Sequence, residues 1–293
     1  MKYLEYLFFR CLYVGISIIP FRLLYVLSDS CAFLMQYLIR YRIKTVSDNL
    51  KNAFPDKSND EIKTITRQFY KYLCDVTLES IKGYYSNKQL LKRYRFLNPE
   101  VVNQYYEKRQ SVIIALGHYG NWEWATQVVG RVYKHRLVTL YKPMTNRYVD
   151  KFINKLRTKR NMELASIYDV KFIFRSDEGE PKAFILVSDQ SPGNAMKAIW
   201  LKFLNQDTAC LRGIENYAKL FNLPVIFMDI QRVRRGHYTV EMQEICTNPS
   251  ETLPGEITGM YMRKLEGIII KKPEDWLWSH RRWKLKKYKQ VNQ

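Results

Sequence analysis

One continuous stretch of the chain indicates its fold: Ser111-Val112-Ile113-Ile114-Ala115-Leu116-Gly117-His118-Tyr119-Gly120-Asn121-Trp122-Glu123. The first six residues form an apolar run that is typical of a buried strand. Gly117 and Gly120 allow a tight turn, and the residues from Trp122 onward have the pattern of a helix. This order of elements places His118 at the carboxyl end of a strand, where open α/β sheets bind their ligands.

The flanking sequence predicts more strands and helices in alternation. Short apolar runs at 111–116, 137–141, 183–188 and 225–230 predict strands, and 238–242 predicts an edge strand. Helices are expected at 45–95, 148–161 and 213–221. Within the first of these, Ser58 and Glu61 have the spacing of a capping box. We therefore expect an α/β fold: a single domain with a mostly parallel or mixed central sheet flanked by helices.

His118 and Glu123 are the candidate catalytic pair. A base whose tautomer is fixed by a neighbouring carboxylate is the arrangement that activates a hydroxyl. In this interpretation His118 takes the proton and Glu123 orients the imidazole. The alternatives are a histidine with a structural role in the turn and a metal-binding pair. A metal is disfavoured because the spacing is not that of a zinc helix and no other ligand cluster is evident.

The composition indicates an anionic partner. The 293 residues carry a formal net charge of +20, which attracts nucleic acid, an anionic membrane or an acidic protein. The sequence has no nucleic-acid-binding motif and no glycine-rich phosphate loop, so nucleic acid is disfavoured. A non-catalytic basic protein that binds membrane or nucleic acid remains the alternative from another class. Five scattered cysteines without zinc spacing favour a reducing compartment.

The amino terminus is rich in apolar residues over 3–27, with Pro20 and Arg22 inside the run. We expect a membrane-associated helix that either spans the bilayer or lies in its interface, with a buried helix of the fold as the alternative. The expected division is an anchor helix over 1–28 and a catalytic domain over 29–293. A basic cluster at 40–44 suits anionic headgroups. The tryptophans and basic residues of the carboxy-terminal segment also suit a membrane interface.

The motif at 117–123 resembles the first acyltransferase motif of the lipid A biosynthesis late acyltransferases. These are bacterial lauroyl and myristoyl transferases within the glycerophosphate-acyltransferase superfamily. The sequence pattern of this family resembles segments along most of this chain. The matching segments are Asn49-Leu50, Ala53-Phe54-Pro55, Glu79, 141–146, Arg157, Asp189-Gln190, Pro224 and the 277–284 sequence Leu-Trp-Ser-His-Arg-Arg-Trp-Lys.

The resemblance implies a membrane-associated O-acyltransferase. The acyl donor would be acyl carrier protein, and the acceptor a hydroxyl of a phosphorylated glycolipid, the lipid A precursor, in the anionic inner membrane. The catalytic domain would lie on the cytoplasmic side. The substrate-binding residues would be Arg157, Asp189, Gln190, Asn121 and Trp122. No metal and no organic cofactor is implied.

Several roles stay open at this point. Arg157 could stabilise an oxyanion, hold a substrate phosphate or lie on a helix surface. Backbone amides near 120–122 are further candidates for the oxyanion donors. Phe203-Leu204-Asn205 stands where many members have Phe-Phe-Gly, and Leu211-Arg212-Gly213 also departs from the pattern. A different bacterial acceptor lipid, an amino-acid lipid or a glycolipid, is therefore the alternative function.

Overall fold

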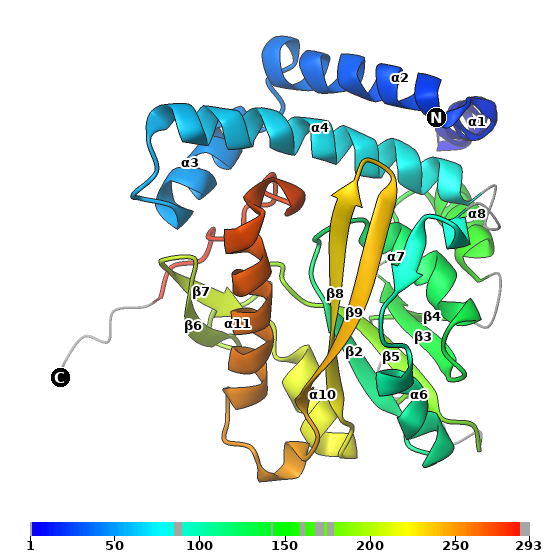
Figure 1. Cartoon of the computed structure of the whole chain (residues 1–293), viewed down its shortest axis with the longest axis vertical. Coiled ribbons are helices and arrows are strands. Elements are labelled where there is room, and N and C mark those ends of the chain that lie inside the picture. The colour runs from blue at the N-terminus through cyan, green and yellow to red at the C-terminus, as the bar shows by residue number, and fades with distance from the viewer. Residues whose placement is uncertain are drawn as a thin grey trace.

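The computed structural model describes residues 2–84, 90–141, 143–158, 162–167, 173–174 and 179–287, and every structural statement below concerns these residues. Lys142 and the expected end of a helix at 159–161 lie outside them. The described chain forms one mixed α/β domain with a seven-stranded sheet in the order β1-β9-β8-β2-β5-β3-β4 (Figure 1). The strands are β1 (Tyr94–Phe96), β2 (Val112–Leu116), β3 (Arg136–Tyr141), β4 (Met162–Ser166), β5 (Lys182–Val187), β8 (Val225–Arg234) and β9 (His237–Cys246).

The sheet is mostly parallel, as predicted. Only β8 and β9 pair antiparallel among its named strands. Every residue of the central strand β2 is buried. Ile113 and Ala115 join the core on one face, whereas Val112, Ile114 and Leu116 join the core on the other. Burial on both faces explains why this strand has a continuous apolar run instead of an alternating pattern. The expected edge strand, β9, pairs with strands on both sides because β1 lies outside it.

Helices cover both faces of the sheet. The long helix α4 begins with the predicted capping box, in which Ser58 Oγ accepts from Glu61 N at 3.3 Å. Figure 1 shows α4 crossing the end of the sheet where β2 finishes. The helices are α3 (Ile43–Ala53), α4 (Asn59–Gly83), α6 (Glu100–Glu107), α7 (Trp122–Val128), α8 (Arg147–Arg157), α10 (Gly213–Phe221) and α11 (Glu256–Lys271).

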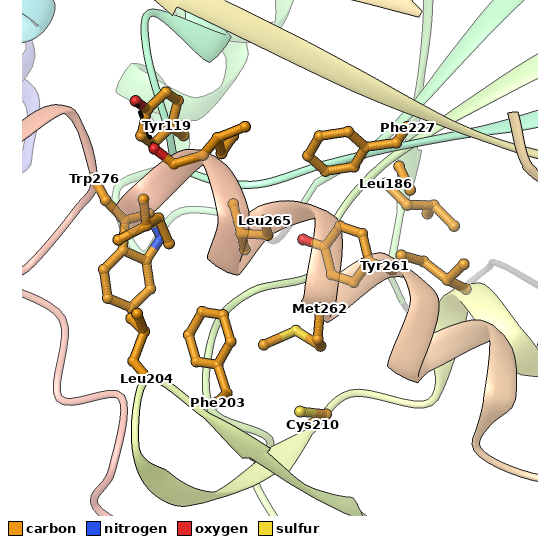
Figure 2. Packing of buried hydrophobic residues seen from close by; sticks show 14 of the residues in the cluster. Tyr119, Leu186, Phe203, Leu204, Cys210, Phe227, Tyr261, Met262, Leu265 and Trp276 are labelled. Carbon is orange, nitrogen blue, oxygen red and sulfur yellow. Dashed lines mark hydrogen bonds between the residues drawn. The ribbon is translucent and has the colours of Figure 1, made fainter. Parts of the chain in front are cut away.

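Helix α11 packs between the sheet and a separate hairpin of β6 (Ile199–Phe203) and β7 (Gln206–Cys210). Figure 2 shows Tyr261 lying toward the sheet residues Leu186 and Phe227, while Met262 lies toward Phe203 of the hairpin. The Tyr261 hydroxyl donates to the carbonyl of Leu116, the last residue of β2, at 2.8 Å. The helix therefore also fixes the strand end that precedes the histidine.

The amino terminus forms two helices where one was expected. Helix α1 (Lys2–Ile18) ends before Pro20, which is the N-cap of α2 (Phe21–Phe33), and a π-helical turn follows at Leu34–Leu38. In the described chain, no helix combines the length and the hydrophobicity needed to cross a bilayer. Both helices pack on α4, and α1 also contacts α8. The division expected after residue 28 falls inside α2.

The carboxy-terminal tryptophans correct one expectation. Trp276 and Trp278 are 2% and 0% exposed and belong to the core. Their rings pack edge to face with centroids 4.7 Å apart. They therefore do not form the membrane-interface aromatic surface that their basic neighbours suggested, because the core takes up their apolar area.

Candidate active site

The turn after β2 is fixed by its glycines and by hydrogen bonds from α4. Gly120 has φ 61°, and a Cβ at this position would lie 2.5 Å from the Ile230 carbonyl oxygen. Both facts require glycine at this point of the turn. Tyr72 of α4 donates from its hydroxyl to the Gly120 carbonyl at 2.7 Å. The turn is thus packed closely against β8 at Ile230 and hydrogen-bonded to α4 through Tyr72. These contacts set the backbone position of His118.

Asp189 contacts His118 twice. It follows β5, the parallel neighbour of β2, so the two residues come from adjacent strand ends. His118 Nδ1 lies 2.6 Å from Asp189 Oδ1, and the His118 backbone N donates to Asp189 Oδ2 at 2.9 Å. Trp276 Nε1 donates to the same Oδ2 at 2.8 Å. Both the orientation and the tautomer of the imidazole follow from these contacts.

The charge state of Asp189 suits this role. Its side chain is 2% exposed, and burial alone would raise the carboxyl pKa. The charge of His118 and the hydrogen bonds from His118 and Trp276 outweigh burial and lower the pKa to about 2. When His118 is neutral, the ionised Asp189 accepts a hydrogen bond from Nδ1–H, which leaves the Nε2 lone pair of the imidazole available as a base.

Gln190 lies at this second nitrogen of the ring. Its side-chain Nε2 is 3.3 Å from His118 Nε2. The Trp122 ring packs edge to face against the imidazole, with centroids 5.0 Å apart. The predicted site residues Asp189, Gln190 and Trp122 are therefore all brought to His118.

Glu123 takes a different partner from the one expected. Its Oε1 accepts from Arg157 Nε at 2.8 Å and from Arg157 Nη2 at 2.5 Å, and the Tyr84 hydroxyl also donates to it. The orienting contact to the His118 imidazole that the spacing suggested is made by Asp189. The physical reason is that Glu123 lies in the first turn of α7, where its side chain is directed toward α8 and the end of α4. Burial lowers the pKa of Arg157, but Glu123 and Tyr84 raise it more strongly, so this guanidinium stays charged.

Asn121 holds the turn through both polar atoms of its side chain. Its Oδ1 accepts from Trp124 N at 3.0 Å as the cap of α7, and its Nδ2 donates to Glu79 Oε2 at 2.8 Å. Asn121 is fully buried. Its geometry is that of a residue that positions the histidine turn.

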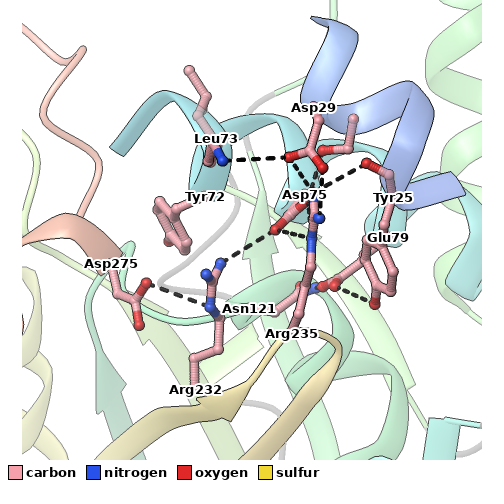
Figure 3. Close-up of polar contacts among 12 residues, drawn as sticks. Tyr25, Asp29, Tyr72, Leu73, Asp75, Glu79, Asn121, Arg232, Arg235 and Asp275 are labelled. Atoms are coloured by element: carbon pink, nitrogen blue, oxygen red, sulfur yellow. Dashed lines mark hydrogen bonds and ion pairs between the residues drawn. The ribbon is translucent and has the colours of Figure 1, made fainter. Parts of the chain in front are cut away.

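Glu79 of α4 is the centre of this buried polar layer (Figure 3). Tyr25 and Tyr238 also donate to its carboxylate, at 2.8 and 2.6 Å. Burial raises the pKa of Glu79 to about 7, although the hydrogen bonds from Tyr238, Tyr25 and Asn121 oppose this shift. The layer connects α2 with the turn that carries His118.

A second set of charges in Figure 3 supports the segment before Trp276. Arg232 lies 3.7 Å from Asp275 and 3.5 Å from Asp75, and Arg235 pairs with Asp75 at 2.6 Å. The Asp275 carbonyl accepts from Gly120 N at 3.0 Å. This bond occupies one of the backbone amides considered as an oxyanion donor.

A largely apolar cavity of about 360 Å³ lies beside the site. Trp122, Glu123 and Arg157 line it, and other residues of α1, α4 and α8 supply most of the remaining wall. Trp122 therefore touches both the imidazole and the cavity. Within the described residues, no cluster of three or more His, Cys, Asp or Glu side chains could hold a metal ion.

Three residues of the site were missed by sequence reasoning. Trp276 bonds Asp189, Tyr84 bonds Glu123, and Tyr72 bonds the turn. The signal for Trp276 was present, since it immediately precedes the carboxy-terminal motif. Nothing in the pattern around Tyr72, or around Tyr84 at the C-cap of α4, distinguishes them from the other aromatic residues of this segment.

A histidine fixed by a buried aspartate at two adjacent strand ends, next to an apolar cavity, is an arrangement that suits a general base in an α/β fold. The family model for bacterial lipid A biosynthesis acyltransferases matches residues 1–285, and the chain belongs to that family. It is an acyltransferase of the lipid A type. A search of curated proteins found no matching relative.

Proposed function

We propose that the protein transfers a fatty acyl chain from acyl carrier protein to a hydroxyl of a lipid A precursor, with His118 as the general base. The observation that carries this proposal is the His118–Asp189 pair, with Nδ1 and Oδ1 2.6 Å apart and Trp122 between the imidazole and the apolar cavity. This proposal differs from the expected His118–Glu123 dyad in one respect. Asp189 orients the imidazole of His118, and Glu123 pairs with Arg157 at the cavity wall.

The reaction follows from the tautomer. His118 Nε2 takes the proton of the acceptor hydroxyl while its oxygen attacks the thioester carbonyl carbon. The resulting imidazolium is stabilised by Asp189. The carbon–sulfur bond then breaks, and the imidazolium returns the proton to the leaving thiolate. The products are an ester and a free thiol, and the side chains end in their starting state. Gln190, 3.3 Å from Nε2, would yield its place to the acceptor hydroxyl.

The apolar cavity suits the acyl chain. Its wall includes Phe9 and Tyr13 from α1, Val76 from α4 and Ile153 from α8. Glu123 and Arg157 are the charged residues that line it, and their mutual pairing leaves little net charge facing an apolar chain. The acyl chain would lie in this cavity with its thioester near Trp122.

The surface of the amino-terminal helices suits a membrane. Large apolar side chains of α1 and α2 are exposed, including Leu4 at 68%, Phe8 at 67% and Val26 at 63%. Arg10, Arg22 and the basic cluster at 40–44 lie in the same part of the sequence. An apolar helix face with flanking cations binds the interface of an anionic bilayer. This favours the cytoplasmic face of the inner membrane as the location.

The test is transfer of a labelled acyl group from acyl carrier protein to a tetra-acylated lipid A precursor in detergent. Wild type should transfer the label, and His118→Ala should lose at least about 10³-fold in rate. His135→Ala is the matched control, because that imidazole lies at the opposite end of the sheet beside Gln110. The same assay is then run with a total membrane lipid extract. If the label appears only on another lipid, the proposed acceptor is wrong and the proposed acyl-transfer reaction stands.

Membrane association is tested separately. Leu4→Glu with Phe8→Glu should release the protein from membranes, whereas high salt without detergent should leave the wild type bound. Release of the wild type by salt alone would show a purely electrostatic contact and contradict this part of the proposal.

A further inference from the structure

A basic cavity of about 720 Å³ lies between α3 and the carboxy-terminal segment, away from the apolar cavity. We call it the basic pocket. Five cations line it against one carboxylate, Asp48. The cations are Arg40, Arg42, Lys44, Arg281 and Lys284.

The walls of the basic pocket are fixed to the rest of the fold. Asn49 of α3 donates from Nδ2 to the carbonyls of Trp278 and His280, at 2.9 and 3.0 Å. Arg42 donates to the Ser279 carbonyl at 2.9 Å. On the other side, Arg282 is 1% exposed and donates to the Ala209 carbonyl of β7 at 2.6 Å. The segment carrying Arg281 is therefore held between α3 and the hairpin, as Figure 1 also shows.

Most of the positive charge of the basic pocket is not balanced by carboxylates. Among the residues that the structure describes, no carboxylate is within ion-pair distance of Arg40, Lys44, Arg281 or Lys284. Arg40 and Arg42 also have left-handed backbones, with φ 53° and 51°. Non-glycine residues in this conformation are found where the surrounding structure enforces it, frequently at ligand sites. Cations gathered in this way without a carboxylate in ion-pair contact favour an anionic ligand.

The surroundings of the basic pocket favour a lipid headgroup as the source of the anion. The chain just before Arg40 carries exposed apolar side chains, including Leu38 at 67% and Ile39 at 66%. A headgroup lies at such a boundary, with its acyl chains on the apolar side and its phosphate on the cationic side.

The basic pocket is also close to His118. Trp276 bonds Asp189, and five residues later Arg281 lines the pocket. Five residues span at most about 18 Å when fully extended, and the turns here shorten that distance. Burial lowers the pKa of His280, the residue before Arg281, to about 4, although the charge of Asp189 opposes this shift.

We infer that the basic pocket binds a phosphate monoester on the headgroup of the acceptor lipid while an acyl hydroxyl of that lipid reaches His118. This inference rests on the proposed function for the identity of the acceptor. The binding of a lipid phosphate itself is testable without any turnover.

The first experiment measures co-sedimentation with phosphatidylcholine vesicles that contain about 10% of either phosphatidic acid, a phosphate monoester, or phosphatidylglycerol, a diester. Wild type should bind the monoester vesicles at least about 10-fold more tightly than the diester vesicles. Arg281→Glu with Lys284→Glu should remove this preference. Lys108→Glu with Arg131→Glu is the control, since both side chains are exposed and the net charge changes equally.

Each result bears on the inference. Equal loss in the control variant, or an unchanged preference in the pocket variant, overturns it. If the charge reversal impairs folding, Arg281→Gln with Lys284→Gln should still reduce the preference. Inorganic phosphate that competes as well as the lipid phosphate at equal concentration would assign the basic pocket to free phosphate and overturn the headgroup assignment.

The second experiment separates this inference from the proposed function. The pocket variant should raise KM for the phosphorylated acceptor about 10-fold while leaving KM for acyl carrier protein unchanged. A rise confined to KM for acyl carrier protein would make the basic pocket a docking site for that acidic protein and overturn the inference. An enzyme without transfer activity but with the monoester preference would contradict the proposed acceptor and leave the phosphate site standing.

Discussion

Two carboxylates near the histidine have opposite surroundings. Asp189 is 2% exposed, accepts three hydrogen bonds and contacts the imidazole directly. Glu123 is 18% exposed, lies at the wall of the apolar cavity and contacts a guanidinium. The residue closer to His118 in sequence is therefore the one that does not touch its ring. Glu123, in the first turn of α7, is held by Arg157 of α8 and by Tyr84, whereas neighbouring parallel strands end side by side and bring Asp189 to His118.

Asp189→Asn should have the largest effect. The amide keeps the shape but presents an N–H donor to Nδ1, which places the remaining ring proton on Nε2 and removes the base. We expect kcat to fall by about 10³–10⁴-fold with little change in KM. Steady-state transfer kinetics check this, with thermal unfolding as the control for folding. A loss below about 10-fold would contradict the orienting role of Asp189.

Glu123→Gln should have an intermediate effect. It leaves the Arg157 guanidinium without its carboxylate and disturbs the Tyr84 hydrogen bond at the cavity wall. We expect kcat/KM to fall about 10–100-fold, mainly through KM for the acyl donor. The comparison of the two carboxylates would fail if Glu123→Gln reduced kcat as strongly as Asp189→Asn with KM unchanged.

The sequence predicted the central fold well because its strands are buried on both faces and have continuous apolar runs. It missed β4 and also β1, which begins inside the stretch 45–95 that was expected to be helical. It also missed the β6–β7 hairpin, whose tight turn places Leu204 and Asn205 at φ 49° and 63°. Leucine is rarely found in this conformation, so the turn gave no local signal. It also expected one amino-terminal helix, although Pro20 divides the segment into α1 and α2.

The candidate site was predicted in part. The histidine turn and the strand end at Asp189 follow from apolar runs that stop at polar residues. Which carboxylate orients the imidazole does not follow, since it depends on the strand order that places β5 beside β2. The burial of Trp276 and Trp278 depends on contacts with α3 and the hairpin, far away in sequence.

The last prediction concerns the stability of the fold at the turn that carries His118. Glu79 holds Asn121, and its pKa is raised from 4.5 to about 7 because it is buried. A raised carboxyl pKa means that the folded state favours the protonated form. The resulting stabilisation is complete below pH 4.5 and is lost as the pH rises through 7, an effect of about 3 kcal/mol at most.

Glu79→Gln removes this titration and keeps a neutral side chain at all pH values. The wild type should therefore lose stability relative to Glu79→Gln between about pH 5 and pH 8. Thermal unfolding midpoints measured across this range test the prediction. Glu107→Gln is the matched control, since its carboxylate is exposed and pairs with Lys134. Parallel curves for wild type and Glu79→Gln would mean that Glu79 stays ionised in the fold, held by its three hydrogen-bond donors, and that α4 holds the turn by a charged contact instead of a neutral one.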